Sequence, residues 1–291
     1  WIKSRNQADF DHMLFDSVRA STTAQPFDLR SNKNNLESTD TSGLVSFDSD
    51  GFTLNSGGYV NTGSFASWNW KKSATSGFDI VTATGTGSAK TIAHSLSAVP
   101  SIIISKEKSG SVNDWVMYHV SLGNNKKMIL NETNAVGTDS CWNNTTPTSS
   151  VFSVSGASVV NRNSSTYVYY LFSEKKGYSK FGSYDSNSNA NGPFVYLGFK
   201  PALVIVKCTT AAESWGLVDS KRAPINLTSV AVLNANTNGT EGGAEIDLLS
   251  NGFKLTAVSG QFNKSGSHSY IYMAFAENPL VASNYVPTTA R

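Results

Sequence analysis

Charged side chains are scarce in this sequence: they make up 15% of its 291 residues, and the net charge at pH 7 is +2. So weak a charge provides no field that would favour nucleic acid or a strongly acidic partner. Only two cysteines occur, Cys141 and Cys208, which excludes a disulfide framework. No apolar run approaches the roughly 18 residues of a membrane-spanning helix, so the sequence predicts no membrane insertion.

A helical pattern of apolar residues is also missing throughout the chain. The polar positions are filled by Ser, Thr, Asn and Gly more than by Lys and Glu, which favours turns over helices. Hydrophobic residues still make up 39% of the chain and aromatic residues 11%, enough to build packed cores. The composition therefore predicts an all-β fold of short strands joined by turns.

What the sequence does contain is a repeated order of landmarks. Lys106 and Lys207 each end an apolar strand that follows a proline, they lie 101 positions apart, and Lys3 occupies the matching point near the start. A second apolar strand, a polar segment and a Phe-containing strand follow each lysine in turn. Each set ends on an aromatic strand, found at 65–70, 167–172 and 270–275. Chance similarity between β-rich segments explains one such landmark but not five.

The landmarks predict tandem β-sandwich repeats of about 100 residues. The expected domains are an incomplete first repeat at 1–75, a second at 76–177, a third at 178–280 and a C-terminal tail at 281–291. The first repeat lacks the strands that precede the lysine in the other two. Such a sandwich would leave ladder edges and apolar faces open. We therefore expect this chain to be a piece of a longer polypeptide, its first repeat completed by residues outside 1–291 or by a neighbouring subunit.

Seven short strands separated by turn residues are expected in the second repeat, the pattern of a β-sandwich. They are predicted at 78–84, 90–95, 101–106, 115–122, 127–132, 151–155 and 166–173. Residues 102–104 are apolar on both faces, as in a strand buried between two layers. The predicted core residues are Ile103, Val116, Phe152 and Val168 in the second repeat and Val204, Leu217, Phe253 and Ile271 in the third.

Segments that resemble ligand-binding motifs are incomplete. Residues 84–91 look like a phosphate-binding loop, but a strand rather than a helix follows them. Residues 185–192 alternate oxygen ligands as a calcium loop does, yet Ala190 stands where glycine is required. The four histidines share no metal-ligand spacing. We expect no catalytic residue, no cofactor and no metal site, with a loose surface cation site at 185–192 as the weaker alternative.

Two repeated carboxylates, Asp16 and Asp219, each lie three positions before an arginine, Arg19 and Arg222. This spacing predicts an ion pair at a strand end rather than half of a glycosidase pair. The aromatic residues of the terminal strands predict core or inter-repeat packing, and a stacking surface for sugars or bases is the alternative. These residues are Trp68, Trp70, Tyr167, Tyr169, Tyr170, Tyr270 and Tyr272.

One loop stands apart because the other repeats have no counterpart of it. Residues 134–149 carry Trp142 followed by Asn143 and Asn144, outside any strand pattern. An aromatic residue on a polar loop is a candidate for contact with a partner. We therefore predict that these three residues bind a partner, and that Trp142→Ala weakens that contact while leaving folding intact.

Several strings together resemble a known family. They are Trp-Ile-Lys-Ser-Arg-Asn-Gln (1–7), Leu-Phe-Asp-Ser-Val-Arg (14–19), Asp-Gly-Phe (50–52), Trp-Asn-Trp (68–70), Gly-Phe-Asp-Ile-Val-Thr-Ala-Thr-Gly-Thr-Gly (77–87), Gly-Tyr-Ser-Lys-Phe-Gly-Ser-Tyr (177–184) and Met-Ala-Phe-Ala-Glu-Asn-Pro (273–279). Across nearly the whole chain they look like the tandem repeat domains of structural proteins, often labelled tail fibres, of marine tailed bacteriophages.

This resemblance implies a non-enzymatic virion protein, made in the host cytoplasm and carried on the extracellular particle. A tail fibre or similar appendage that mediates host attachment is the first expectation. Its partners would be other virion proteins, two further copies in a homotrimer, and a glycan or protein of the host surface. A capsid-decorating or capsid-stabilising protein and a tail-associated glycan-degrading enzyme are the alternatives. The family offers no catalytic residues to carry over.

Overall fold

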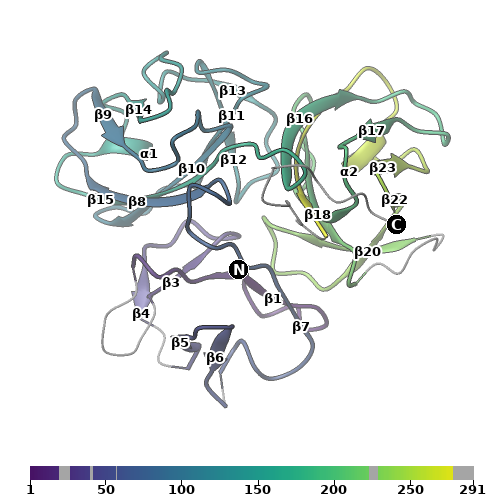
Figure 1. Cartoon of the computed structure of the whole chain (residues 1–291), viewed down its shortest axis with the longest axis horizontal. Coiled ribbons are helices and arrows are strands. Elements are labelled where there is room, and N and C mark those ends of the chain that lie inside the picture. The colour runs from purple at the N-terminus through teal and green to yellow at the C-terminus, as the bar shows by residue number, and fades with distance from the viewer. Residues whose placement is uncertain (20–26, 40–41, 57, 223–228, 278–291) are drawn as a thin grey trace.

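The computed structural model of this chain is nearly all β, as the composition predicts (Figure 1). Two single-turn helices, α1 (Ser158–Asn161) and α2 (Gly260–Asn263), accompany the strands in the part of the chain that the structure describes. No helix among these residues is long and apolar enough to cross a membrane. The structure describes residues 1–19, 27–39, 42–56, 58–222 and 229–277. The predicted tail at 281–291 lies outside them.

Three antiparallel sheets form the main layers. The first sheet runs in the order β4 (Ser38–Thr39), β3 (Phe27–Arg30), β2 (Met13–Leu14), β1 (Ile2–Ser4) and β7 (Phe65–Ser67). The second sheet runs β13 (Gly137–Thr138), β12 (Lys126–Ile129), β11 (Val116–His119), β10 (Ile102–Ser109), β15 (Thr166–Phe172) and β8 (Phe78–Thr84). The third sheet runs β21 (Gly242–Ala244), β20 (Val230–Asn234), β19 (Gly216–Asp219), β18 (Pro201–Cys208), β24 (Ser269–Ala276) and β16 (Ser179–Asp185).

Each large sheet is accompanied by a smaller one. The smaller sheets are β5 (Leu44–Phe47) with β6 (Phe52–Leu54), β14 (Val151–Val154) with β9 (Lys90–Ala93), and β17 (Phe194–Tyr196) with β23 (Gly252–Leu255) and β22 (Ile246–Leu249). We call the three groups of strands the first, second and third units. Figure 1 shows them as three lobes around a common centre. The boundaries at residues 75, 177 and 280 remain predictions.

Two kinds of apolar core hold the units together. Within the second and third units, one core lies between the large sheet and the smaller one. A further core is shared, with residues of all three units among its members. Strand β10 lies between both kinds: Ile103 packs in the core of its own unit, and Ile102 and Ile104 pack in the shared core. This explains why residues 102–104 are apolar on both faces.

The predicted core residues are all buried. Their exposed fractions do not exceed 2%: Ile103, Val116, Phe152 and Val168 in the second unit, and Val204, Leu217, Phe253 and Ile271 in the third. The predicted strand at 115–122 is shorter in the structure, where β11 ends at His119. Its end follows from a turn in which His119 O accepts hydrogen bonds from Leu122 N and Gly123 N.

Candidate functional site

A buried lysine joins each unit to the next. Lys3, Lys106 and Lys207 are 1%, 0% and 0% exposed. Each ammonium group donates to a backbone carbonyl of another unit: Lys3 Nζ to Asn238 O at 3.0 Å, Lys106 Nζ to Asn34 O at 3.0 Å and Lys207 Nζ to Thr133 O at 2.9 Å. These contacts run from the first unit to the third, from the second to the first and from the third to the second, and so close a ring. We call the three contact regions the 1/3, 1/2 and 2/3 seams.

The lysine environment favours a structural role. Burial lowers the pKa of Lys3, Lys106 and Lys207 to about 8. A lowered pKa in a cleft would suggest a catalytic amine. Lys106 Nζ, however, also donates to Glu107 O at 3.0 Å and to Asn113 O at 2.9 Å. With three carbonyl acceptors around it, this ammonium group has no donor left for a substrate.

The backbone repeats the same contact at every seam. A main-chain hydrogen bond crosses each one: Glu241 N to Arg5 O at 2.9 Å, Glu37 N to Lys108 O at 3.1 Å and Val136 N to Thr209 O at 2.9 Å. Indole groups add to two of them, since Trp115 Nε1 donates to Arg30 O at 2.9 Å and Trp215 Nε1 to Ile129 O at 2.9 Å. The relative placement of the units therefore rests on main-chain acceptors, which a residue of any type supplies.

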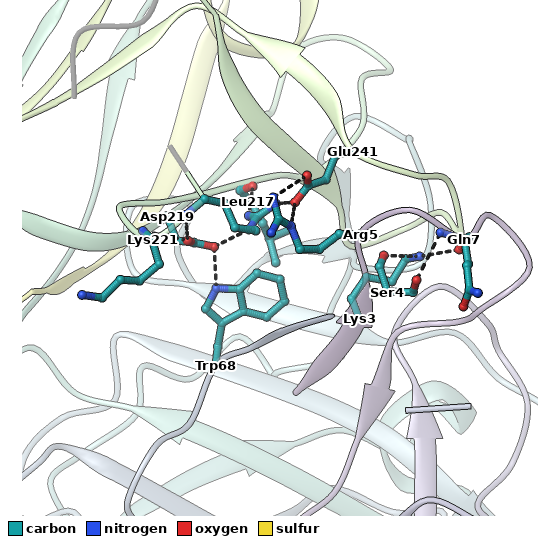
Figure 2. Close-up of polar contacts among 10 residues, drawn as sticks. Lys3, Ser4, Arg5, Gln7, Trp68, Leu217, Asp219, Lys221 and Glu241 are labelled. Atoms are coloured by element: carbon teal, nitrogen blue, oxygen red, sulfur yellow. Dashed lines mark hydrogen bonds and ion pairs between the residues drawn. The ribbon is translucent and has the colours of Figure 1, made fainter. Parts of the chain in front are cut away.

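The 1/3 seam adds a charge network, buried at Asp219 and Arg222 and partly exposed at Glu241 and Arg5 (Figure 2). Asp219 accepts from Arg222 Nε at 2.6 Å and from Trp68 Nε1 of the first unit at 3.1 Å. Arg222 Nη1 in turn donates to Glu241 at 3.1 Å, and Arg5 Nε reaches the same carboxylate across the seam at 2.7 Å. Figure 2 shows the indole of Trp68 pointing at Asp219 and the Arg5 side chain at Glu241. The predicted ion pair is present, and it lies at an interface rather than on the surface.

The 1/2 seam repeats this network with two changes of donor, since Tyr170 and Lys108 replace Trp68 and Arg5. Asp16 is paired with Arg19 Nε and accepts from Tyr170 Oη of the second unit at 2.7 Å. Arg19 Nη1 donates to Glu37 at 2.9 Å. Burial by itself raises the pKa of Asp16, but the charge of Arg19 and the hydrogen bonds from Arg19 and Tyr170 outweigh it and hold that pKa below its ordinary value. The carboxylate is therefore kept charged inside the molecule.

The 2/3 seam is neutral at the same positions. By strand register, His119 stands where Asp16 and Asp219 stand, and Met273 where Tyr170 stands. His119 Nδ1 accepts from Ser121 N at 3.1 Å, so the Nε2–H donates to Tyr272 O at 3.2 Å. Burial lowers the pKa of His119 to about 4, against that hydrogen bond. This histidine is thus a neutral structural group at pH 7.

A cavity of about 790 Å³ adjoins the first unit. Its walls include Trp68 and Trp70 after β7, Phe47 and Phe52 of the β5–β6 hairpin, and side chains of the shared core. Charges of both signs lie along it: Asp16, Asp48, Asp50, Lys71 and Lys72. The volume falls in the range of ligand pockets, about 300–1,000 Å³.

The predicted partner loop needs a correction. Trp142 is 1% exposed and packs against Tyr118 in the second unit's own core, with ring centroids 6.0 Å apart. The loop folds inward because Cys141 O accepts from Ser155 N next to β14 at 2.9 Å. Trp142→Ala is therefore expected to cost about 3–5 kcal/mol of stability, as a core aromatic does, which reverses the expectation of intact folding. Asn143 and Asn144 stay exposed, with φ of 52° and 47°, and their binding role remains a prediction.

The aromatic residues of the terminal strands are packed inside the protein rather than exposed on its surface. At most 8% of each side chain is exposed in Trp68, Tyr167, Tyr169, Tyr170, Tyr270 and Tyr272, and Trp70 is partly buried against the shared core. The hydroxyl groups of Tyr167, Tyr169 and Tyr270 donate to backbone carbonyls within the protein, as Tyr169 Oη does to Val160 O at 2.6 Å. The prediction of core and inter-unit packing is confirmed for these residues.

The polar loop at 185–192 is organised by its own amides. Asn187 Oδ1 accepts from Asn189 N at 3.1 Å and from Asn263 Nδ2 at 3.3 Å, and Asn189 Oδ1 accepts from Asn191 N at 2.8 Å. The oxygen atoms that a cation would need therefore already stabilise the turn. Among the residues that the structure describes, no group of three or more His, Cys, Asp or Glu could hold a metal.

Sequence reasoning found the lysine landmarks but not what they bind. The signal for the seams was present in the repeat alignment, where Asp16, His119 and Asp219 fall at one position, and Tyr170, Met273 and Trp68 at another. A hydrogen-bond donor in the second set accompanies each aspartate, and methionine accompanies the histidine.

Comparison with known proteins gives one result. The family model described as Domain of unknown function (DUF7483) matches residues 1–279. No curated protein and no solved structure gives a significant match. Function therefore has to be argued from the residues themselves.

Proposed function

We propose that this chain, which belongs to the DUF7483 family, is a non-enzymatic structural protein of a virion, a tail fibre or similar appendage that mediates host attachment. The observation that supports this proposal is that the buried ionisable residues join the units to one another. Lys106 and Lys207 bind carbonyls across the seams, and Asp219 binds Trp68 and Arg222. Groups engaged in this way stabilise a scaffold and leave no nucleophile or base free at these positions.

A closed ring of packed units suits a protein that must persist outside a cell. Stability in such an array is the sum of the units and their interfaces. The low charge of the chain leaves little for seawater salt to screen. The class of protein, a component of a bacteriophage particle, comes from the resemblance of the sequence strings. Other virion proteins, further copies in a trimer and a glycan or protein of the host surface are the partners that we propose on the same basis.

The glycan-degrading alternative has one feature in its favour, the acids along the cavity. A glycosidase needs a carboxylic acid that stays protonated, hence one with a raised pKa. The pKa of Asp16 is lowered although burial opposes this, and hydrogen bonds from Ser46 and Thr53 lower the pKa of Asp48. Both therefore favour the charged form, so the non-enzymatic function is the better proposal.

The test locates the protein on the particle. Antibodies against purified residues 1–291, labelled with gold, are applied to intact particles and imaged by electron microscopy. We expect label on the tail, and purified protein that competes with particles for host adsorption. Label spread over the capsid would favour the decorating protein instead. Absence of the chain from purified particles, or release of reducing sugar from host glycan by the protein, would contradict the proposal.

A further inference from the structure

The third unit exposes two aromatic rings on one face of its small sheet, formed by β17, β23 and β22 (Figure 1). Val195 and Phe253 of this sheet face the core of the unit, at 7% and 0% exposure. Because successive residues of a strand point to opposite faces, Phe194 and Tyr196 both lie on the outer face. They are 46% and 59% exposed. The unit thus presents two neighbouring aromatic side chains to solvent.

The fold does not require aromatic residues at these positions. The matching face of the second unit is formed by β9 and β14. Aligned on the buried phenylalanine that β14 and β23 share, the register places Thr91 and Ala93 where the third unit has Phe194 and Tyr196. Thr91 and Ala93 are also exposed, so a small side chain suffices at both positions. The two rings therefore contribute nothing that the sandwich needs, and a binding role accounts for them.

Neighbouring groups hold both rings in place. The Phe194 ring lies above Gly252, where an added Cβ would come within 3.1 Å of Phe194 Cε2. Lys180 Nζ lies 5.5 Å from the centroid of the Tyr196 ring and donates to Tyr196 O at 2.8 Å. Rings that are already positioned lose little conformational entropy when a ligand stacks on them.

Polar groups flank the two rings. In register, Phe194 is paired with Lys254, and Lys254 with Asp247, so all three lie on the outer face. Lys254 Nζ donates to Asn191 Oδ1 at 2.7 Å, which brings the exposed Asn191 to the same face. Within the described part of the chain, neither the Asn191 amide nitrogen nor the Asp247 carboxylate takes part in a hydrogen bond or ion pair. A donor and an acceptor are therefore available beside the rings.

The size and charge of this surface select the kind of ligand. An aromatic side chain has about 150–250 Å² of surface, so the two rings together expose about 160–260 Å². A stable protein interface needs about 800 Å² from each partner, which makes these rings too small a surface to hold a second copy of this chain. Single-stranded nucleic acid needs a positively charged groove, whereas Lys254 and Asp247 lie side by side here. A small, uncharged ligand fits both observations.

We propose that Phe194 and Tyr196 form a stacking site for a neutral saccharide chain, with Asn191 and Asp247 binding its hydroxyl groups. One face of a pyranose ring presents C–H groups, and stacking on an aromatic ring removes both apolar surfaces from water. Hydroxyl groups donate and accept, which suits an amide nitrogen together with a carboxylate. As the source of the saccharide we take the host surface glycan, which rests on the proposed function.

Three neutral tetrasaccharides serve as probes, the β-1,4-linked tetramers of glucose, mannose and galactose. Each is titrated into the full chain and followed by nuclear magnetic resonance. We expect saturable binding of at least one, with saturation transferred mainly to its ring C–H protons and shift changes confined to residues 191–196 and 247–254. A thymidine tetranucleotide tests stacking of bases instead, and it should bind at least about tenfold more weakly.

A matched set of variants tests the rings themselves. F194T/Y196A gives the third unit the residues of the second and should weaken binding at least about tenfold, with circular dichroism checking that the fold is kept. If it does not fold, Tyr196→Ala takes its place. Phe194→Tyr keeps a ring and should preserve binding. Tyr59→Ala is the control, because Tyr59 is 58% exposed but lies in the first unit, and it should bind as the wild type does.

Four results would overturn the proposal. The first is no binding of any of the three tetrasaccharides, and the second is unchanged binding by F194T/Y196A. The third is an equal loss in Tyr59→Ala, which would mean that any exposed aromatic ring suffices. The fourth is tighter binding of the nucleotide. None of these results bears on where the protein lies on a particle. Label on the tail without saccharide binding would therefore refute this site and leave the proposed function standing.

Discussion

The 1/3 and 2/3 seams join the same structural elements with opposite chemistry. At the first, Trp68 meets the carboxylate of Asp219, which is paired with Arg222. At the second, the neutral ring of His119 bonds to Tyr272 O next to Met273. Both seams keep the lysine and the main-chain hydrogen bond. The placement of the units therefore depends on the backbone contacts, while the side chains between them are free to be charged or neutral, provided that they change together.

The physical reason is the cost of a lone buried charge. A buried ion pair contributes little compared with an apolar group of the same size, but removal of one partner leaves the other uncompensated. A single substitution at a charged seam is therefore costly, whereas a complete replacement is tolerated.

The largest effect is expected where one charge of the 1/3 seam is removed. Asp219→Ala leaves the guanidinium of Arg222 and the indole of Trp68 without their shared acceptor, which should cost about 3–5 kcal/mol. Chemical denaturation of the two proteins measures it. Lys221→Ala, an exposed neighbour, is the control and should stay within about 0.5 kcal/mol of the wild type. Similar losses for both variants would mean that the network contributes no more to stability than an exposed side chain does.

A smaller loss of stability is expected from substitution of the buried lysine that all three seams share. Lys106→Met leaves the carbonyls of Asn34 and Asn113 without their donor, which should cost about 1–3 kcal/mol. The exposed Lys176 provides the control, Lys176→Met. If Lys106→Met were as stable as the wild type, the lysine contacts would not be what holds the units in place.

The lysines also predict a pH dependence. Because burial lowers the pKa of Lys106 to about 8 from 10.5, the unfolded chain holds the proton more tightly than the folded one between these values. The contribution of Lys106 to stability should therefore rise with pH from about 8 to about 10.5. Lys106→Met should show a shallower rise than the wild type, measured by denaturation across that range.

Much of the fold could be predicted from local pattern. Strand β8 has its predicted bounds, Phe78–Thr84, and the core residues were found because alternation and repeat position act over a few residues. What Lys106 binds could not be found in this way, since Asn34 O lies 72 positions away in another unit. The ring exists only after three units pack together, and no local pattern encodes its closure.

The Trp142 loop shows where local pattern gives the wrong prediction. Its composition is that of an exposed turn, and Asn143 and Asn144 are indeed exposed. Trp142 nevertheless packs in the core with Tyr118, a residue far from it in the sequence. A feature found in one unit only was expected to carry function, and here it also fills that unit's core.

Lowering the pH should reduce the contribution of the neutral 2/3 seam to stability before that of the charged seams. The pKa of His119 is lowered to about 4 by burial, so between about 6.5 and 4 the unfolded chain takes up a proton that the folded one does not. Stability should fall as the pH is lowered through this range. The lowered pKa of Asp16 keeps its contribution until the pH falls below 3.8.

The variant His119→Gln tests this difference. It keeps a donor for Tyr272 O and removes the proton uptake, so the slope should flatten by up to about 1.4 kcal/mol per pH unit. The slope that remains belongs to other groups, among them His12, His94 and the amino group of Trp1, whose pKa values burial also lowers. An unchanged slope would show that the folded protein protonates His119 as readily as the unfolded chain does.

The smallest effect is expected from exchanging one seam's chemistry for the other's. The quadruple variant D16H/R19L/E37V/Y170M gives the 1/2 seam the side chains of the 2/3 seam, since Leu122 and Val136 stand where Arg19 and Glu37 stand. It removes the three charged side chains and the Tyr170 donor together, so no buried charge is left without its partner. Replacement of a buried ion pair by packed apolar groups is often neutral.

We therefore expect this quadruple variant to lie within about 1–2 kcal/mol of the wild type, although Asp16→His alone should cost at least about 3 kcal/mol. The two values must come from the same denaturation experiment, because their difference shows whether the seams are interchangeable. Residues in one network are not additive, and the excess of the single loss over the combined loss measures their coupling. If the quadruple variant loses as much as the single one or more, the seams are not interchangeable. In that case the charge network at the 1/2 seam, and not the backbone contacts, determines how the first and second units meet.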